Sequence, residues 1–186
     1  MPSLERLPQT DEEGRLRAVV ETPQGSRHKL AYDPSAGAFT IKATMPAGMS
    51  FPFDFGFFPR TRAADGDPLD VLVLMDGPAY PGCLVPVKLL GVIEAEQSED
   101  GGEPIRNDRL IAVADGSTER GDLRSVRDFE PSLVEQLESF FVTYDRFDGK
   151  DFRILALRGP RRARTLLKAA AISPRKARAR GAAPSK

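Results

Sequence analysis

Closely spaced turns divide the first half of this chain into short extended segments, and this spacing restricts the fold more than any other feature. Extended segments at 15–22, 28–33 and 38–44 are separated by turns at 23–26 and 34–37. Turns about every eight to twelve residues are typical of small sheets and barrels. With 186 residues, of which 40% are apolar, the chain is long enough for one domain with a substantial core.

The second half of the chain adds further strands and the first helical patterns. Apolar runs predict strands at 69–74, 84–94, 109–113 and 151–157, and the polar, Gly-rich segment 97–108 predicts a loop. Pro131 and Pro160 each open a helical pattern, and Ser173-Pro174 ends the second one. The apolar stripe of the first helix consists of Leu133, Leu137, Phe140, Phe141 and Tyr144. We therefore expect an α+β, mainly β fold, a mostly antiparallel barrel with one or two packed helices.

Charge is distributed unevenly along the chain. Residues 1–157 carry 17 basic and 27 acidic side chains, a net charge of −10, whereas residues 158–186 carry ten basic side chains and no acidic one. An acidic body attracts Mg²⁺ and disfavours polyanions, and a basic segment does the reverse. Residues 173–186 are too poor in apolar side chains to form a core, so we predict a disordered basic tail. Weak nucleic-acid binding through this tail is the alternative to a merely solvated extension.

Several features fit a cytoplasmic protein. Residues 1–14 are polar and acidic without the apolar core of a secretory signal, so we expect an N-terminal extension ahead of a folded domain at 15–172. No run approaches the roughly 18 apolar residues that a membrane span requires. Cys83 is the single cysteine, which excludes an intrachain disulfide, and it is most simply a small core residue.

Three aspartates lie together where a predicted strand begins. Asp65, Asp67 and Asp70 occur in the sequence DGDPLD, directly ahead of an apolar run. A carboxylate in such a run costs several kcal/mol unless a partner compensates it, and a hard divalent cation is a natural partner for clustered carboxylates. Asp65 and Asp67 face the same side of an extended chain. Gly66 and Pro68 can interrupt the strict alternation of side chains, so that the side chain of Asp70 turns to the same side. This pattern predicts a metal site, with a solvated Asp/Gly/Pro turn as the alternative.

Two segments together resemble the soluble family I inorganic pyrophosphatases. Phe51-Pro52, Phe55-Gly56-Phe57, Pro59 and Thr61 resemble the aromatic segment of that family, and Asp65 to Asp70 followed by Val71 resembles its signature. The supporting residues are Glu21, Pro23, Lys29, Pro81, Gly82, Gly91, Val92, Phe140, Phe141 and Tyr144. The resemblance covers roughly residues 15–157 and implies an OB-like five-stranded antiparallel barrel with one or two flanking C-terminal helices, Mg²⁺ dependence and cytoplasmic location. It also implies a homo-oligomer, in bacteria often a hexamer.

The resemblance implies hydrolysis of pyrophosphate, or of a related phosphoanhydride, to phosphate. Asp67 would be the base that assists deprotonation of the attacking water. The residues implied at the metal site are Asp65, Asp70, Glu21 and Asn107, with Glu21 ordering metal-bound waters. The residues implied to hold phosphate oxygens are Lys29, Arg109 and Tyr144. The alternatives are a solvated strand lysine for Lys29 and the end of the helical apolar stripe for Tyr144.

Seven positions depart from the family pattern. Ala31 replaces an acid, Ala43 an arginine and Asp145 a lysine, Phe51 and Phe55 replace tyrosines, and Gln97 and Asn107 replace carboxylates. Lys42 adjoins Ala43, but strict alternation would point its side chain to the opposite strand face. Asp108 would enter the site only if the alignment slipped by one residue, so we prefer Asn107. We expect a magnesium-dependent pyrophosphatase with fewer side chains to hold the substrate. The alternative is a catalytically impaired relative that serves as a phosphate-binding, metal-binding or interaction module.

Overall fold

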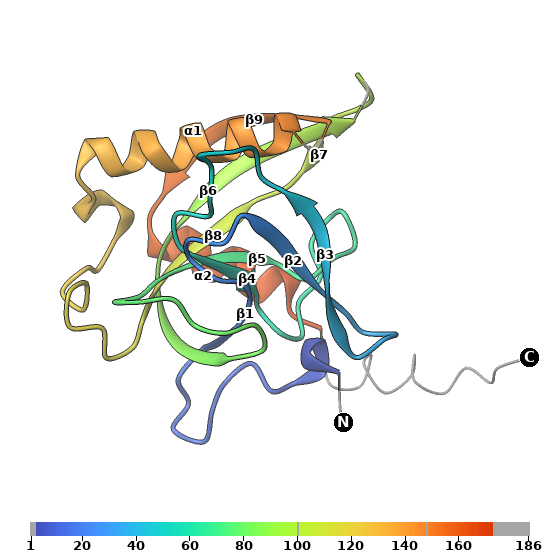
Figure 1. Cartoon of the computed structure of the whole chain (residues 1–186). Helices are drawn as coiled ribbons and strands as arrows, with labels where there is room; N and C mark the ends of the chain where they lie inside the picture. The colour runs from blue at the N-terminus through green and yellow to red at the C-terminus, as the bar shows by residue number, and fades with distance from the viewer. Residues whose placement is uncertain (1–2, 100, 148, 173–186) are drawn as a thin grey trace, which may run out of the picture.

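A computed structural model describes residues 3–99, 101–147 and 149–172. Within these residues the strands are β1 (Arg17–Thr22), β2 (His28–Asp33), β3 (Ala38–Thr44), β4 (Asp54–Phe57), β5 (Asp70–Leu74), β6 (Leu84–Glu99), β7 (Ile105–Arg106), β8 (Arg109–Ala114) and β9 (Lys150–Arg158). The helices are α1 (Pro131–Phe147) and α2 (Pro160–Ala170), with single 3₁₀ turns at Leu4–Arg6 and Val126–Asp128. Figure 1 shows how these strands and helices are arranged.

Five strands close into a ring in the order β1, β4, β5, β8 and β6, and β6 pairs again with β1. This ring confirms the expected OB-like barrel. Four of its pairings are antiparallel, but β5 and β8 run parallel, with Val71 opposite Leu110. Both strands are buried along almost their whole length, as is usual for parallel strands, and this explains their unbroken apolar sequence. At Gly56 a Cβ would lie 1.8 Å from the carbonyl oxygen of Val19, so only glycine allows β4 to approach β1.

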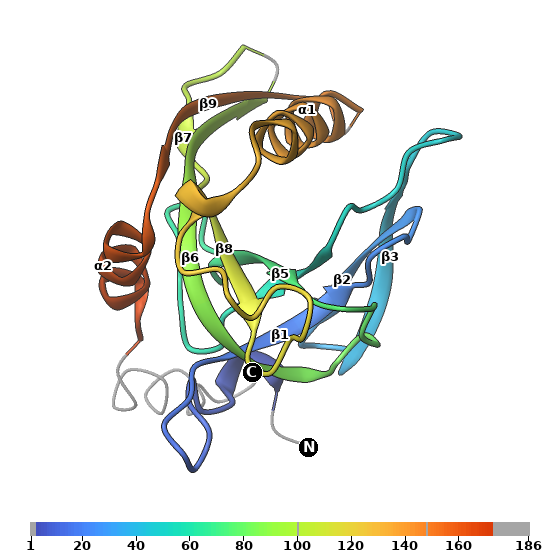
Figure 2. The ribbon, with the colours of Figure 1, turned by 90° about the vertical axis from the view of Figure 1, so that its left-hand side faces the viewer.

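The two helices cover different sides of the barrel. Figure 2 shows α1 across one end, the β2–β3 hairpin along the side, and α2 on the outer face of β6. Because side chains alternate along β5, Leu72 and Leu74 enter the core beneath α1, while Val71 and Val73 enter a second core that includes Leu167 of α2. The predicted stripe of α1 is confirmed, since Leu137, Phe140, Phe141 and Tyr144 are buried and Leu133 is partly buried.

One predicted loop is partly strand. Residues 97–99 continue β6, and Ile105–Arg106 forms β7 beside it. This part of β6 pairs with β9, where Arg153 binds Glu96 at 2.7 Å and Lys150 binds Glu99 at 3.5 Å. The extension is held by backbone pairing and exposed ion pairs rather than by apolar burial, so the hydrophobic pattern did not reveal it.

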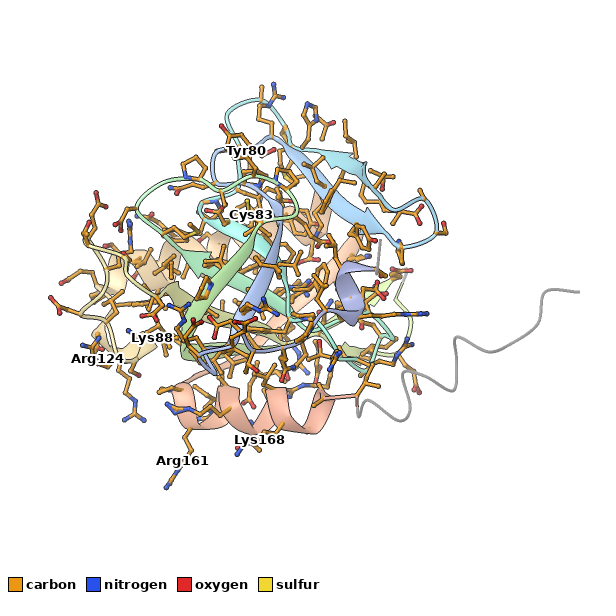
Figure 3. All side chains as sticks on the ribbon, turned by 90° about the horizontal axis from the view of Figure 1, so that it is seen from below. Tyr80, Cys83, Lys88, Arg124, Arg161 and Lys168 are labelled. Carbon is orange, nitrogen blue, oxygen red and sulfur yellow. The ribbon has the colours of Figure 1, made fainter. Side chains whose placement is uncertain are left out.

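The second helix and the cysteine can be compared with the predictions from sequence. α2 ends at Ala170, whereas the predicted Ser173-Pro174 stop and the basic tail 173–186 lie outside the described residues. Figure 3 shows Arg161 and Lys168 projecting from the outer side of α2. Cys83 is half-buried against the second core. Neither of the described helices is long and apolar enough to cross a membrane.

Candidate active site

One pocket of about 600 Å³ gathers side chains from distant parts of the chain. All eight residues expected at the site line it: Glu21, Lys29, Asp65, Asp67, Asp70, Asn107, Arg109 and Tyr144. They come from β1, β2, the β4–β5 loop, the start of β5, the β7–β8 segment and the end of α1. The fold therefore brings the expected residues together in one place.

The acidic wall of the pocket is the loop between β4 and β5. Asp65 and Asp67 are exposed, and Asp65 Oδ1 accepts a 3.1 Å hydrogen bond from the backbone N–H of Asp67. Thr61 fixes the loop, because its hydroxyl donates to Phe58 O at 2.6 Å and accepts from Leu69 N at 2.8 Å. Desolvation by the surrounding pocket and the charges of Asp70 and Asp67 raise the pKa of Asp65. The segment is therefore both the Asp/Gly/Pro turn of the alternative interpretation and one wall of the pocket.

The three aspartates do not converge on a single point. Within residues 3–99, 101–147 and 149–172, no three His, Cys, Asp or Glu side chains form a group placed to hold a metal ion. Asp70 Oδ2 accepts a hydrogen bond from Nη1 of Arg109. Asp65 and Asp67 share the pocket with Asp70, but the latter faces a cation of the chain itself.

Glu21 is a buried carboxyl group on β1. Its Oε1 accepts a 2.7 Å hydrogen bond from the backbone N–H of Tyr32, which links β1 to the β2–β3 hairpin. Burial raises the pKa of Glu21 to about 7, although the Tyr32 N–H and the charge of Lys29 act in the opposite direction. Glu21 can therefore exchange a proton near neutral pH.

Lys29 of β2 and Tyr144 of α1 also line the pocket. The Lys29 ammonium lies 4.2 Å from the ring centroid of Phe55 and 5.4 Å from that of Tyr144. Because it packs against these two rings, Lys29 does not simply project into solvent, and burial lowers its pKa. Tyr144 stacks on Phe140 at 5.9 Å within the core and also lines the pocket. Both interpretations of Tyr144 therefore describe part of its environment.

Arg109 is the most deeply enclosed cation of the pocket. The residue is 4% exposed, and its guanidinium lies 5.6 to 5.8 Å from the ring centroids of Phe55, Phe141 and Phe152. Besides Asp70, its Nη1 contacts Oδ1 of Asn107. The Asn107 amide in turn donates to Oε1 of Gln97 at 2.5 Å. Two amides, a guanidinium and a carboxylate thus form one connected network.

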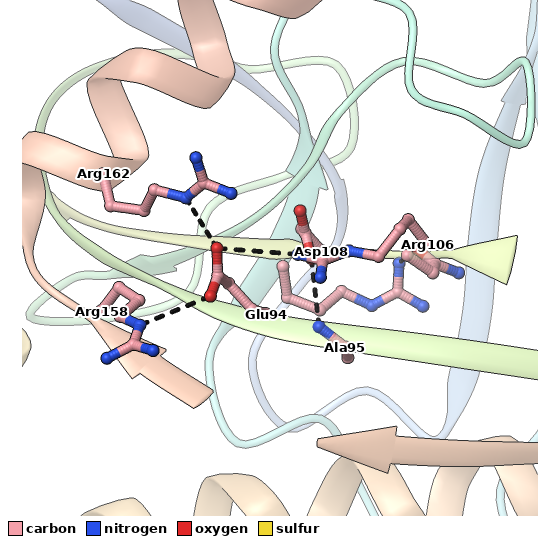
Figure 4. Close-up of polar contacts among 8 residues, drawn as sticks. Glu94, Ala95, Arg106, Asp108, Arg158 and Arg162 are labelled. Carbon is pink, nitrogen blue, oxygen red and sulfur yellow. Dashed lines mark hydrogen bonds and ion pairs between the residues drawn. The ribbon is translucent and has the colours of Figure 1, made fainter. Parts of the chain in front are cut away.

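Asn107, rather than Asp108, faces the pocket. Asp108 Oδ1 accepts from the backbone N–H of Ala95 at 3.1 Å and from Arg106 at 2.6 Å, on the other side of the strand (Figure 4). On that side Glu94 also pairs with Arg106, Arg158 and Arg162. Alternation along residues 106–109 therefore sends Asn107 and Arg109 inward and Arg106 and Asp108 outward.

Sequence reasoning misplaced one basic residue. Lys42 lines the pocket together with Ala43, although strict alternation assigned it to the opposite face. The reason is a β-bulge: Lys29 pairs with Ala43 and Leu30 pairs with Ile41, so Lys42 is the extra residue. A bulge redirects a side chain, and here it supplies a lysine beside the alanine that replaces the expected arginine.

Three further charged residues line the pocket, and none of them was assigned a role from the sequence, where Asp145 was noted only as an acid in place of a lysine. Asp145, near the end of α1, is buried, and burial raises its pKa to about 6 despite the nearby charges of Arg109, Lys29 and Lys150. Lys150 comes from the first residue of β9, and Glu5 comes from the N-terminal 3₁₀ turn. Only the folded arrangement brings Lys150 and Glu5 to the pocket, because neither lies near a recognisable motif.

The fold and the pocket together define an OB-like barrel protein whose site joins carboxylates to several cations, an arrangement suited to a small, highly charged ligand. The family model for inorganic pyrophosphatase matches residues 18–173, and the chain belongs to the inorganic pyrophosphatase family. Over 151 residues it is 34% identical to the inorganic pyrophosphatase of Thermus thermophilus, an alignment that covers 81% of this chain and 83% of that protein. Over 152 residues it is 32% identical to that of a Nostoc species, covering 82% and 87%.

Solved structures show the same similarity. The crystal structure of the Thermus thermophilus inorganic pyrophosphatase has a TM-score of 0.80 at 29% identity and covers 96% of this chain and 99% of that one. The structure of an inorganic pyrophosphatase from Coxiella burnetii has a TM-score of 0.78 at 27% identity and covers 88% and 97%. The expected family is therefore confirmed by sequence and by fold.

Proposed function

We propose that this chain hydrolyses inorganic pyrophosphate to two phosphates, with Mg²⁺ as its cofactor. The observation that carries the proposal is that all eight residues expected from the family resemblance line one pocket. Membership of the inorganic pyrophosphatase family supports the class of reaction.

The donor set of the pocket suits Mg²⁺. The ion prefers oxygen ligands, keeps several waters and is commonly held by one or two carboxylates together with substrate phosphates, so three convergent carboxylates are not required. Asp65 and Asp70 would hold the ion, Glu21 would order its waters, and Asn107 offers an amide oxygen. When bound, Mg²⁺ neutralises pyrophosphate and makes a coordinated water more acidic.

The residues of the chain bind the substrate and move the proton. Asp67 is exposed in the pocket and acts as the base that accepts a proton from the attacking water. Lys29 and Tyr144 hold phosphate oxygens. Lys42, redirected by the bulge, supplies the positive charge that an arginine at position 43 would have supplied. Arg109 adds fixed positive charge to the same site.

We expect turnover to be slow, because several groups that would bind phosphate are missing. Ala43 presents only a methyl group where the family pattern has an arginine, and Phe51 and Phe55 lack the hydroxyl groups of the tyrosines that they replace. Each lost hydrogen bond to a charged group costs about 1.5 to 3 kcal/mol, and about 1.4 kcal/mol corresponds to a tenfold change in rate. Lys42 offsets part of this loss.

A phosphate-release assay with pyrophosphate and Mg²⁺ tests the proposal. We expect Asp67→Asn to lower kcat by about 100-fold or more, because the carboxylate that accepts the proton is replaced by an amide. Asp122→Asn is the matched control, since Asp122 is exposed and lies outside the pocket, and it should keep the wild-type rate. Equal phosphate release by the wild type and Asp67→Asn would contradict the assigned role of Asp67.

One observation favours the second candidate function, a catalytically impaired protein that binds phosphate or metal or serves as an interaction module. Asn107 donates to Gln97 and accepts from Arg109, so part of the pocket wall is occupied by contacts within the chain. This function predicts that pyrophosphate binds in isothermal titration calorimetry, whereas the wild type and Asp67→Asn show the same negligible turnover with saturating Mg²⁺ or Mn²⁺.

The family resemblance also supports a cytoplasmic homo-oligomer, which we propose to be a hexamer. Size-exclusion chromatography with light scattering tests this state, because a hexamer has six times the 20.3 kDa mass of the chain. A particle with the mass of one chain would contradict it.

A further inference from the structure

A second hollow, of about 700 Å³, lies where the 3₁₀ turn at Val126–Asp128, the end of β9 and the start of α2 meet. It shares no residue with the candidate active site. Four arginines line this arginine hollow, namely Arg127 from the 3₁₀ turn, Arg158 from β9, and Arg161 and Arg162 from α2. Because residues 1–157 carry a net charge of −10, this positive charge is a local feature of one surface.

A nearly buried carboxylate holds two of these arginines in place. Glu94 Oε2 accepts from Nε of Arg158 at 3.4 Å, and Glu94 Oε1 accepts from Nε of Arg162 at 2.6 Å. Both contacts use Nε, so the terminal Nη nitrogens of each guanidinium face away from the carboxylate (Figure 4). Since Glu94 belongs to the central strand β6, it positions both charges at the hollow and leaves their Nη groups available to a ligand.

The other two arginines contribute charge that nothing in the described part of the chain neutralises. The side chains of Arg127 and Arg161 are exposed, and neither takes part in a hydrogen bond or an ion pair with another described residue. Asp128 is the single acid among the described lining residues, and its Oδ2 accepts from the backbone N–H groups of Arg124 and Ser125 at 2.8 and 2.9 Å. The hollow therefore combines four positive charges with one negative charge.

The lining favours a compact ligand that carries several phosphate groups. Guanidinium groups bind phosphate oxygens as a planar fork of N–H donors, and a phosphate group carries more negative charge than a carboxylate at neutral pH. Ser125 and Thr165 add hydroxyl groups to the same lining. Among the described lining residues there is no aromatic side chain on which a nucleotide base could stack. The hollow is thus suited to recognise phosphate groups and nothing else of a ligand.

We propose that the arginine hollow binds an inorganic oligophosphate, a linear chain of phosphate groups such as tripolyphosphate. Arginines contact the anion directly here, whereas the candidate active site combines cations with carboxylates. Binding in the hollow therefore needs no divalent cation. Because the two sites share no residue, the inference does not rest on hydrolysis of pyrophosphate in the other pocket.

Titration calorimetry of the full chain with sodium tripolyphosphate, in the absence of divalent cations, tests the proposal. The double variant Arg127→Gln with Arg161→Gln should bind one tripolyphosphate fewer per chain than the wild type. The matched control is Arg124→Gln with Arg164→Gln, which removes the same charge next to the 3₁₀ turn and from α2 but outside the arginine hollow. It should keep the wild-type number. Equal losses in both double variants, or no loss in the first, would overturn the proposal.

Chemical modification locates the ligand on the unaltered chain. Phenylglyoxal reacts with accessible guanidinium groups, and mass spectrometry identifies the modified positions. Tripolyphosphate should slow the modification of Arg127 and Arg161 and leave that of Arg124 and Arg164 unchanged. Equal protection of both pairs would overturn the proposal, and so would a failure of Arg127 and Arg161 to react in the free protein, because the hollow would then be covered.

ATP distinguishes an inorganic phosphate chain from a nucleotide. It carries three linked phosphates together with a base, and without divalent cations it should bind the hollow no more tightly than tripolyphosphate. Clearly tighter binding of ATP, lost in Arg127→Gln with Arg161→Gln, would assign the hollow to a nucleotide and overturn the proposal. None of these measurements needs turnover, so a chain that fails to hydrolyse pyrophosphate still tests the proposal.

Discussion

The two faces of the β7–β8 segment carry opposite charge arrangements. On the inner face a single cation, Arg109, is 4% exposed and enclosed by aromatic rings. On the outer face the carboxylate of Glu94 of β6 is 8% exposed and is met by Arg106, Arg158 and Arg162, and Asp108 also pairs with Arg106 (Figure 4). The inner cation has little contact with water, whereas the three outer arginines have side chains 40 to 60% exposed. Removing an ion pair should therefore lower the free energy of unfolding by different amounts on the two faces.

The difference indicates separate roles. The outer cluster joins β6 to β9 and α2, because Glu94 is in β6, Arg158 ends β9 and Arg162 lies in the first turn of α2. It stabilises the packing of a helix on a strand and shares no residue with the pocket lining. The inner cluster of Asp70, Asn107 and Arg109 contributes charge to the pocket, and burial holds the Arg109 guanidinium in one position. Three substitutions test this contrast, in order of decreasing effect.

The largest effect is expected at Arg109. Arg109→Ala should lower the free energy of unfolding by about 3 to 5 kcal/mol, because it leaves Asp70 without its partner and opens a cavity among three rings. Urea denaturation followed by circular dichroism measures the change. Arg120→Ala, at a more exposed arginine over Phe53, should cost clearly less, and equal costs would show that the inner position is not special.

The second effect depends on pH and concerns Asp145. Because its folded pKa is raised from 3.8 to about 6, the carboxyl group favours the folded state when protonated, and this contribution is lost as the pH rises from about 4 through 6. Asp145→Asn should therefore match the wild type near pH 4 and exceed its stability by about 3 kcal/mol above pH 7. Urea titrations at several pH values measure the difference, and a gain that does not vary with pH would refute this explanation.

The smallest effect is expected on the outer face. Glu94→Gln should cost about 1 to 2 kcal/mol at pH 7, because the arginines that it leaves are already partly solvated. The arginines lower the folded pKa of Glu94 below its ordinary value of 4.5, so the cost should be present above that pH and vanish as the pH falls further. Arg153→Ala, which removes an exposed pair with Glu96, is the control and should change stability by less than about 1 kcal/mol. If Glu94→Gln lowered the free energy of unfolding as much as Arg109→Ala does, the two faces would not differ in the way proposed.

The strands of the barrel could be predicted because apolar runs mark them, and the three aspartates stood out because they lie within a few residues of each other. The other five expected site residues came from the resemblance to the pyrophosphatase family, and the pocket brings all eight together. The position of Lys42 was wrong because a bulge depends on pairing between two strands, which one strand's sequence does not reveal. The ring enclosure of Arg109 also escaped prediction, since Phe141 and Phe152 reach it only after α1 and β9 have packed.

The parallel pairing of β5 with β8 has a consequence for the order of folding. Asp70 and Arg109 are 39 residues apart in sequence, and β6 lies between β5 and β8 in the chain and must find its own partners. Closing so long a segment carries an entropy cost that is repaid only when the strands pair, so this seam belongs to the slow, non-local part of folding. A partly folded chain has the aspartate loop but not the cation that faces it, and the binding pocket becomes complete only when the barrel closes.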